Sequence, residues 1–243
     1  MASQILEVMI DIEKTFTALG GEFRTPYEKI QAKLATIKAW IFDWDGVFND
    51  GIKDEQTGSV FAEPDAAGSN YLRFGHWLTH ERAMPFSVIL TGANNPASFR
   101  FAQREHFNAV YLKVLNKMEA LLHIEKEYGI LPHEIAFVFD DVLDLGVASE
   151  VGLRFLVNRK SSPLFANFVK TRNLCDYITA NSGGSQGVRE ICELVLGMSG
   201  VFDKVLEERL AFSSTYTEFL KERNANTPTF YTSENGKIKE IVG

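Results

Sequence analysis

Apolar positions near the start of the chain recur every three or four places. Over residues 4–19 this spacing predicts a helix, which Gly20-Gly21 ends. The same period resumes after Pro26, a residue favoured in the first turn of a helix, and continues to Ile37. Residues 1–36 are therefore predicted to form a helical N-terminal extension that packs against the core or a neighbouring subunit.

From residue 37 onward, short apolar runs alternate with amphipathic stretches of helical period. The runs are residues 40–42, 87–90, 109–112, 136–139 and 155–157, and the helical candidates include 96–107, 117–129 and 143–151. Alternation of this kind predicts a parallel sheet with helices on both faces. We therefore expect an α/β protein with a three-layer, Rossmann-like core over residues 37–199.

Two segments depart from this alternation. Residues 48–62 contain two glycine turns, Asp50-Gly51 and Thr57-Gly58, which predict a small β-hairpin flap. Residues 200–243 begin with a helical stretch and end in a polar tail, which is compatible with disorder or with docking elsewhere on the protein. The expected organisation is an N-terminal extension, a core with a flap, and a C-terminal helix and tail.

Composition and charge narrow the class of protein. The formal net charge is −7 and the isoelectric point is about 5.3, whereas a general nucleic-acid binder would show a basic face. No apolar run approaches the ~18 residues that a membrane span needs. Acidic residues interrupt the apolar N-terminus, which excludes a conventional signal peptide. The two cysteines form no metal or disulfide pattern. We expect a cytoplasmic protein that binds neither nucleic acid nor membrane.

Polar residues stand at or just after the carboxyl ends of four predicted strands. They are Asp43 and Asp45, Thr91 with Gly92, Lys117, and Asp140 with Asp141. Because the ends of parallel strands share one edge of the sheet, these side chains are expected to converge. Lys113 competes with Lys117 for the place of the lysine, and Asp144 is expected to support the acidic loop.

A phosphate ester is the substrate that suits this set of groups. A carboxylate is ionised at neutral pH and can attack phosphorus to form an aspartyl-phosphate. A Mg²⁺ ion held by other carboxylates would remove the repulsion between the two anions, and a lysine and a hydroxyl would stabilise the phosphoryl oxygens. A second aspartate, two residues after the first, can protonate the leaving group and then activate water. The set therefore predicts a Mg²⁺-dependent phosphomonoesterase.

The order of these motifs resembles the haloacid-dehalogenase-like (HAD) phosphatases over residues 37–197. DWDGVFNDG, VILTG, LNK before a helix and VFDDVLDLGVASEVGL are similar to one branch, which contains 3-deoxy-manno-octulosonate 8-phosphate phosphatases and sialic-acid-type sugar 9-phosphate phosphatases. CDYIT and SGGSQGVREICELVL add to the resemblance. It implies a HAD-like fold with a β-hairpin in place of a cap domain. It also implies a homotetramer whose subunits cover each other's active sites, and a small acidic sugar phosphate of eight or nine carbons as substrate.

The resemblance also assigns roles to single residues. It implies that Asp43 is the nucleophile and Asp45 the general acid and base. Thr91 would hydrogen-bond the phosphoryl group, and Lys117 would stabilise both nucleophile and phosphate. The implied substrate-binding residues are Thr91, Gly92, Asn94 and Lys117. The implied Mg²⁺ ligands are Asp43, Asp45 through its backbone carbonyl, Asp140 and, with loop anchoring as its alternative role, Asp141.

Three positions depart from the family pattern. Phe139 stands where a glycine usually precedes the paired aspartates, and Ala93 follows Thr91-Gly92 where an arginine is common. The late glycine loop, residues 183–187, lacks the basic residue that often occurs there. The residues that would bind phosphate are all present, whereas the basic residues that would hold a substrate carboxylate are absent from these two positions.

Two other functions fit the same motifs. A catalytically weak binding or scaffold protein would bind Mg²⁺ or phosphate without turnover, and Phe139 and the absent arginine motivate this reading. A phosphotransferase would pass the phosphoryl group to an acceptor other than water, but Asp45 argues for hydrolysis because activating water is its second task.

His76 and His80 lie four residues apart, a spacing that two ligands of a zinc site can have, but they have no third ligand nearby. Packing roles are therefore expected for them.

Overall fold

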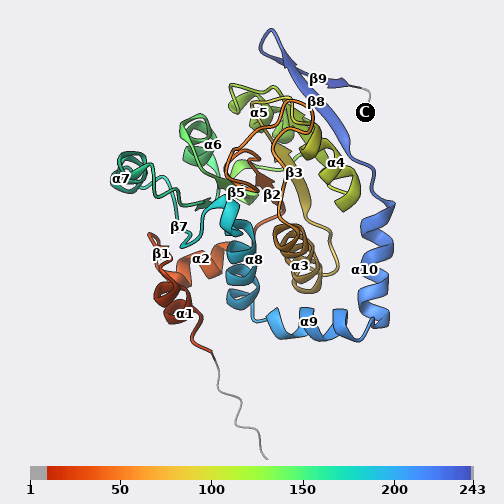
Figure 1. Ribbon diagram of the computed structural model, residues 1–243. Helices are drawn as coiled ribbons and strands as arrows, with labels where there is room; N and C mark the ends of the chain where they lie inside the picture. Colours follow the sequence, from red (N-terminus) through yellow and green to blue (C-terminus); the bar gives the residue numbers. More distant parts are fainter. Residues whose placement is uncertain (1–9, 242–243) are drawn as a thin grey trace, which may run out of the picture.

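The structure, a computed structural model that describes residues 10–241, contains a nine-stranded and mostly parallel sheet (Figure 1). The strands are β1 (Glu22–Phe23), β2 (Ala39–Phe42), β3 (Phe86–Leu90), β4 (Ala109–Leu112), β5 (Ile135–Phe139), β6 (Leu153–Leu156), β7 (Tyr177–Ile178), β8 (Thr229–Glu234) and β9 (Lys237–Ile241). Their order is β1-β7-β6-β5-β2-β3-β4-β8-β9, and only the outermost pairs, β1 with β7 and β8 with β9, are antiparallel. Strand order reverses around β2, which is where open α/β sheets bind ligands.

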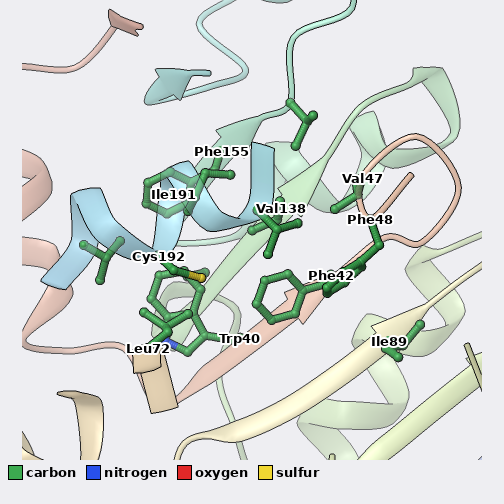
Figure 2. Packing of buried hydrophobic residues seen from close by; sticks show 14 of the residues in the cluster. Trp40, Phe42, Val47, Phe48, Leu72, Ile89, Val138, Phe155, Ile191 and Cys192 are labelled. Carbon is green, nitrogen blue, oxygen red and sulfur yellow. The ribbon is translucent and has the colours of Figure 1, made fainter. Parts of the chain in front are cut away.

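Within the same residues, ten α-helices accompany the sheet. They are α1 (Ile12–Leu19), α2 (Tyr27–Leu34), α3 (Glu63–Thr79), α4 (Pro96–Glu105), α5 (Met118–Tyr128), α6 (Leu145–Glu150), α7 (Pro163–Thr171), α8 (Gly187–Met198), α9 (Phe202–Leu210) and α10 (Ser214–Ala225). Side chains alternate along β2 and so define two layers. Trp40 and Phe42 join a cluster with α3 and α8, whereas Ala39 and Ile41 join one with α5, α6 and α7. Figure 2 shows the first cluster, where the rings of Trp40 and Phe155 stack with centroids 5.8 Å apart.

The predicted α/β fold is confirmed. The five apolar runs correspond to β2 through β6, and the three helical candidates overlap α4, α5 and α6. In the N-terminal extension α1 and α2 are present, and Glu22–Phe23 between them pairs with β7 as an edge strand. The start of the first predicted helix, residues 4–9, lies outside the described residues.

The segment 48–62 does not form the predicted β-hairpin. It contains no strand, and a single antiparallel bridge joins Asp54 to Gly58. An isolated two-stranded hairpin is marginal in water unless it packs against other structure. Here the apolar side chains of Ile52 and Val60 are 79% and 61% exposed. The segment is therefore a loop, which we call the flap loop.

The C-terminal region forms two helices and two strands where the sequence suggested one helix and a polar tail. α9 and α10 pack beside α3, and Phe74, Trp77 and Phe219 share an apolar cluster there. β8 pairs in parallel with β4 and places Tyr231 opposite Tyr111. Figure 1 shows this arm running from α9 past α10 to the far edge of the sheet. No helix among residues 10–241 is long and apolar enough to cross a membrane.

Candidate active site

Trp44 anchors the turn that carries Asp43 and Asp45 out of β2. The indole is fully buried and donates a hydrogen bond from Nε1 to the carbonyl oxygen of Ser59 at 3.0 Å. Gly46 follows with a φ of +93°, a conformation that glycine adopts more readily than other residues. The buried tryptophan thus holds the aspartates on either side of it at the carboxyl edge of the sheet.

Lys117 links the end of β2 to the loop after β5. It directly precedes α5, is 4% exposed, and donates from Nζ to Oδ1 of Asp43 and to Oδ1 of Asp144, each at 2.5 Å. Buried charges are tolerated when each has a partner of opposite sign. The alternative lysine, Lys113, is exposed, so Lys117 supplies the buried ammonium.

The loop after β5 brings further carboxylates to the same place. Oxygens of Asp43, Asp140 and Asp144 lie within 4.8 Å of one another. Asp144 also accepts hydrogen bonds at Oδ2 from the backbone N–H groups of Asp140 (3.4 Å) and Asp141 (3.1 Å). Asp141 is exposed, and its carboxylate accepts from the N–H of Val142 at 2.7 Å. The cluster therefore contains the side chain of Asp144, whereas the predicted ligand Asp141 lies outside it.

This cluster fits a hard divalent cation such as Mg²⁺. Asp140 is 4% exposed, and its Oδ1 is buried with no hydrogen-bond partner among residues 10–241. An unpartnered buried carboxylate oxygen is costly, and a bound cation would satisfy it. Asp43 lies beside it on the neighbouring strand end, so these two side chains are the candidates to hold the ion.

Burial and mutual repulsion raise the pKa values of these carboxyl groups. Burial raises the pKa of Asp43 well above its ordinary value; the Lys117 ammonium opposes this, and Asp144 and Asp140 add to it. Burial, with repulsion from Asp144, also raises the pKa of Asp140 to about 6, against the lowering effect of Arg159. For Lys117, burial lowers the pKa, but the two carboxylates outweigh it, so the net shift is upward and the ammonium stays charged. A divalent cation here would favour the ionised carboxylates.

Asp45 has different partners, on the outer side of the site. Its Oδ1 accepts from Ser59 Oγ at 2.5 Å and from Asn95 Nδ2 at 3.4 Å, and its Oδ2 pairs with Lys53 Nζ at 3.1 Å. The side chains of Asp45 and Lys53 are 21% and 52% exposed. Asp45 is therefore accessible to a ligand that enters from solvent, which a proton donor to a leaving group requires.

Thr91 and its neighbours form the turn after β3. The hydroxyl oxygen of Thr91 accepts from the N–H of Ala93 at 3.1 Å, which leaves the hydroxyl hydrogen free to donate to a ligand. Gly92 lies in the same turn, and the exposed Asn94 lines a cleft with Lys53 of the flap loop. Within residues 10–241 no hydrogen bond joins these side chains to the carboxylate cluster, so their predicted roles depend on a bound substrate.

Phe139 and the glycine loop, two places where the sequence departs from the family pattern, are both packed against the rest of the protein. Phe139 is fully buried and its ring stacks on Phe137, with centroids 5.6 Å apart, so the side chain enters the core and not the acidic loop. In the glycine loop, a Cβ added at Gly183 would overlap the carbonyl oxygen of Gly46, so this loop packs on the turn after β2. The N–H of Gly184 also donates a hydrogen bond of 3.0 Å to Oδ1 of Asp50 in the flap loop.

The sequence interpretation missed Arg159. Its guanidinium donates to Oδ2 of Asp140, at the edge of the carboxylate cluster. The signal that would find it is its place just after the apolar run 155–157, the fifth strand end of the predicted sheet. A basic residue at that position belongs to the same edge as the four strand ends above.

No known family profile matches the chain. The chain is similar to 3-deoxy-D-manno-octulosonate 8-phosphate phosphatase KdsC of Haemophilus influenzae, with 28% identity over 178 residues, which cover 72% of this chain and 92% of the relative. Among solved structures, a HAD superfamily (subfamily III A) hydrolase from Legionella pneumophila gives a TM-score of 0.62 and 26% identity, over 76% of this chain and 95% of that one. The 3-deoxy-D-manno-octulosonate 8-phosphate phosphatase of Moraxella catarrhalis, in complex with magnesium, phosphate and KDO, gives 0.61 and 28%, over 74% of this chain and 97% of that one.

These similarities bear out the resemblance to the HAD-like phosphatases that the motifs indicated. Within that class, the resemblance is to the 3-deoxy-D-manno-octulosonate 8-phosphate phosphatases. The magnesium ion in the relative from Moraxella catarrhalis agrees with the predicted cofactor.

Proposed function

We propose that the protein is a Mg²⁺-dependent phosphomonoesterase that hydrolyses a small sugar phosphate through an aspartyl-phosphate on Asp43. The observation that carries this proposal is the cluster of Asp43, Asp140 and Asp144, two of which, Asp43 and Asp144, hold the Lys117 ammonium. Three carboxylates and one ammonium leave a net negative charge when all are ionised. Such a site suits a divalent cation first and an anionic substrate after it.

In this proposal Asp43 attacks phosphorus through the oxygen that Lys117 does not hold, and the bond from phosphorus to the sugar oxygen breaks. Bound Mg²⁺, held by Asp43 and Asp140, would neutralise charge on the phosphoryl group. Lys117 keeps Asp43 in position, and the Thr91 hydroxyl donates to a phosphoryl oxygen. Water then attacks the phosphorus of the aspartyl-phosphate, which releases phosphate and restores Asp43.

Asp45 serves as acid and then as base. It gives a proton to the leaving sugar oxygen and later takes one from the attacking water. Ser59 Oγ and Lys53 Nζ hold its two oxygens, and Lys53 balances the charge when Asp45 is ionised. Because Lys53 is half exposed, its ion pair is weak and can open when substrate enters.

The substrate class we propose is an acidic sugar phosphate of eight or nine carbons. Two of the relatives named above, from Haemophilus influenzae and Moraxella catarrhalis, act by name on 3-deoxy-D-manno-octulosonate 8-phosphate. Lys53 on the flap loop is a partly exposed cation beside Asp45, and it is the candidate to attract the sugar's carboxylate. The packing of Phe139 in the core removes one reason to expect binding without catalysis.

We also propose a cytoplasmic homotetramer. Three apolar side chains near the site, Leu115, Val142 and Leu143, are 67%, 61% and 53% exposed. A neighbouring subunit that covers them would bury apolar surface and narrow access to the site. Light scattering is expected to give a tetrameric mass, and a monomer at working concentration would contradict this part of the proposal.

Phosphate release from a panel of sugar phosphates tests the function. The panel contains 3-deoxy-D-manno-octulosonate 8-phosphate, a sialic-acid-type 9-phosphate and, as matched controls without a carboxylate, neutral hexose phosphates. We expect turnover in Mg²⁺ that EDTA removes and that favours the acidic sugars. No metal-dependent release from any member would reject the proposed activity, and equal rates on neutral sugars would reject the substrate class.

A further inference from the structure

Arg159 contacts the carboxylate cluster from its outer side. The chain passes from β6, which pairs in parallel with β5, into the loop that carries Arg159, and the guanidinium donates to Oδ2 of Asp140. The side chain of Arg159 is 38% exposed, whereas that of Asp140 is 2% exposed. The other oxygen of Asp140, Oδ1, is buried with no hydrogen-bond partner within residues 10–241. One oxygen of this carboxylate is therefore held by a cation, whereas the other has no donor in the part of the chain that the structure describes.

Gly46 leaves the space in which this pair lies. A Cβ added at Gly46 would overlap both Asp140 Oδ2 and Arg159 Nη2. The turn after β2, which carries Asp43, therefore packs directly on the pair. The position of the arginine is thus tied to that of the proposed nucleophile.

We propose that Arg159 is a positioning residue for the metal, which holds Asp140 by Oδ2 so that Oδ1 is presented to the ion. This inference rests on the proposed Mg²⁺-dependent function. Carboxylates that bind metals are themselves held by hydrogen bonds, and loss of such a partner costs about 10–100-fold in metal affinity. A guanidinium suits the task because it stays charged and its planar N–H groups fit a carboxylate.

Charge alone predicts the opposite effect. Removing a cation beside a metal site reduces repulsion and should strengthen Mg²⁺ binding. Solvent screens that repulsion because Arg159 is partly exposed, whereas its hydrogen bond reaches a carboxylate that is almost fully buried. We therefore expect the loss of positioning to outweigh the loss of repulsion when Arg159 is replaced. Weaker Mg²⁺ binding would indicate positioning, and tighter Mg²⁺ binding would indicate repulsion.

Calorimetric titration of Mg²⁺ into the metal-free full-length protein, without substrate, tests the proposal. Arg159→Gln is expected to bind Mg²⁺ about 10–100-fold more weakly than the original chain. Lys160→Gln removes the same charge from the next, exposed residue and is the matched control, with an expected change within about twofold. Arg159→Lys keeps the charge but loses the planar fork and should fall between. Unchanged or tighter binding by Arg159→Gln would overturn the proposal.

Two further measurements separate positioning from other roles. Circular dichroism in EDTA should show the same fold for all variants. If Arg159→Gln does not fold, Arg159→Lys alone tests the proposal. An unchanged Mg²⁺ affinity in Arg159→Lys would then count against the proposal. At saturating Mg²⁺ the KM for the sugar phosphate should change less than the Mg²⁺ affinity; the reverse would make Arg159 a substrate-binding residue instead. If the unsubstituted protein hydrolyses the sugar phosphate in Mg²⁺ but Arg159→Gln binds the ion with the same affinity, the proposed function stands and this inference is wrong. If the original chain binds no Mg²⁺ and shows no turnover, both fall.

Discussion

The inner and outer sides of the candidate site are built in different ways. On the inner side Lys117, Asp43 and Asp144 are held at the edge of the sheet, and their side chains are 3%, 8% and 1% exposed. On the outer side the flap loop supplies Lys53 and Ser59 to Asp45, and the Lys53 side chain is 52% exposed. The inner groups are placed by the core, whereas the outer ones are placed by a loop.

This difference separates two tasks. Groups held by packed strands and helices keep their geometry, which the proposed attack on phosphorus requires. Residues 50–58 of the flap loop contain no buried side chain. This part of the loop can adapt to the shape of a sugar, because local opening there costs little free energy. The inner side should therefore set the reaction and the outer side the substrate, so substitutions should have unequal effects.

The largest effect is expected for Asp43→Asn. An amide does not form the aspartyl-phosphate, so turnover should fall by about 10⁴-fold or more. The matched control is Asp141→Asn, which changes an exposed aspartate of the nearby acidic loop and should keep most of the activity. Phosphate release checks both. Full activity in Asp43→Asn would remove the inner side from the chemistry.

Lys117→Met should lower both activity and stability. It leaves the buried carboxylates of Asp43 and Asp144 without their cation, at a cost of about 3–5 kcal/mol in the free energy of unfolding. Turnover should fall about 10²–10³-fold because the charge-stabilising donor is lost. Urea denaturation in EDTA and phosphate release measure the two effects. The control Lys113→Met changes an exposed lysine, and equal losses there would contradict the assignment.

Gly46→Ala should damage metal binding more than Gly51→Ala does. Both glycines have a positive φ, +93° and +75°, so each alanine brings a backbone cost of about 1–2 kcal/mol. A Cβ at position 46 overlaps Asp140, whereas the nearest atom to a Cβ at 51 lies 4.0 Å away. We expect at least a tenfold (~1.4 kcal/mol) loss of Mg²⁺ affinity for Gly46→Ala alone. Similar calorimetric affinities in the two variants would contradict the crowding argument.

The smallest effect is expected for Lys53→Gln. Exposed ion pairs contribute about 0.2–1 kcal/mol, so kcat on a neutral sugar phosphate should stay within about fivefold. The KM for an acidic sugar phosphate should rise more than that for a neutral one if the flap loop attracts the carboxylate. Steady-state kinetics on the two substrates provide the comparison. Equal changes in both KM values would show that Lys53 does not contribute to substrate choice.

The inner side was largely predictable from sequence because short apolar runs mark buried strands and parallel topology brings their ends together. Which of two neighbouring aspartates joins the site was not predictable from the sequence. Asp141 and Asp144 both follow β5, and only the short turn at Val142–Asp144 directs the second into the cluster and leaves the first exposed. The place of Arg159 just after the fifth strand end marks it as a residue of the same edge, but its pairing with Asp140 is a contact between two loops that no local pattern shows.

The outer side and the C-terminal arm show where pattern alone fails. Glycine turns at residues 48–62 indicate reversals of the chain, but they do not show whether the intervening residues pair as strands. β8 lies in the segment predicted to be a polar tail. Of its six residues only Phe230, Tyr231 and Thr232 are buried, a run too short to stand out as an apolar strand. Its place beside β4 depends on that strand's free edge, which is a property of the whole sheet.

A burst experiment with Asp45→Asn shows whether Asp43 carries the phosphoryl group. With p-nitrophenyl phosphate the leaving group needs no proton, so the first step should proceed while the second, which needs Asp45 as base, is slowed. If Asp43 is the nucleophile, we expect a Mg²⁺-dependent burst of one nitrophenolate per active site, with one phosphoryl group on the peptide that contains Asp43. A burst that leaves the phosphoryl group on another residue would contradict the role of Asp43 as nucleophile. Steady Mg²⁺-dependent turnover in the double variant Asp43→Asn, Asp45→Asn would contradict it as well.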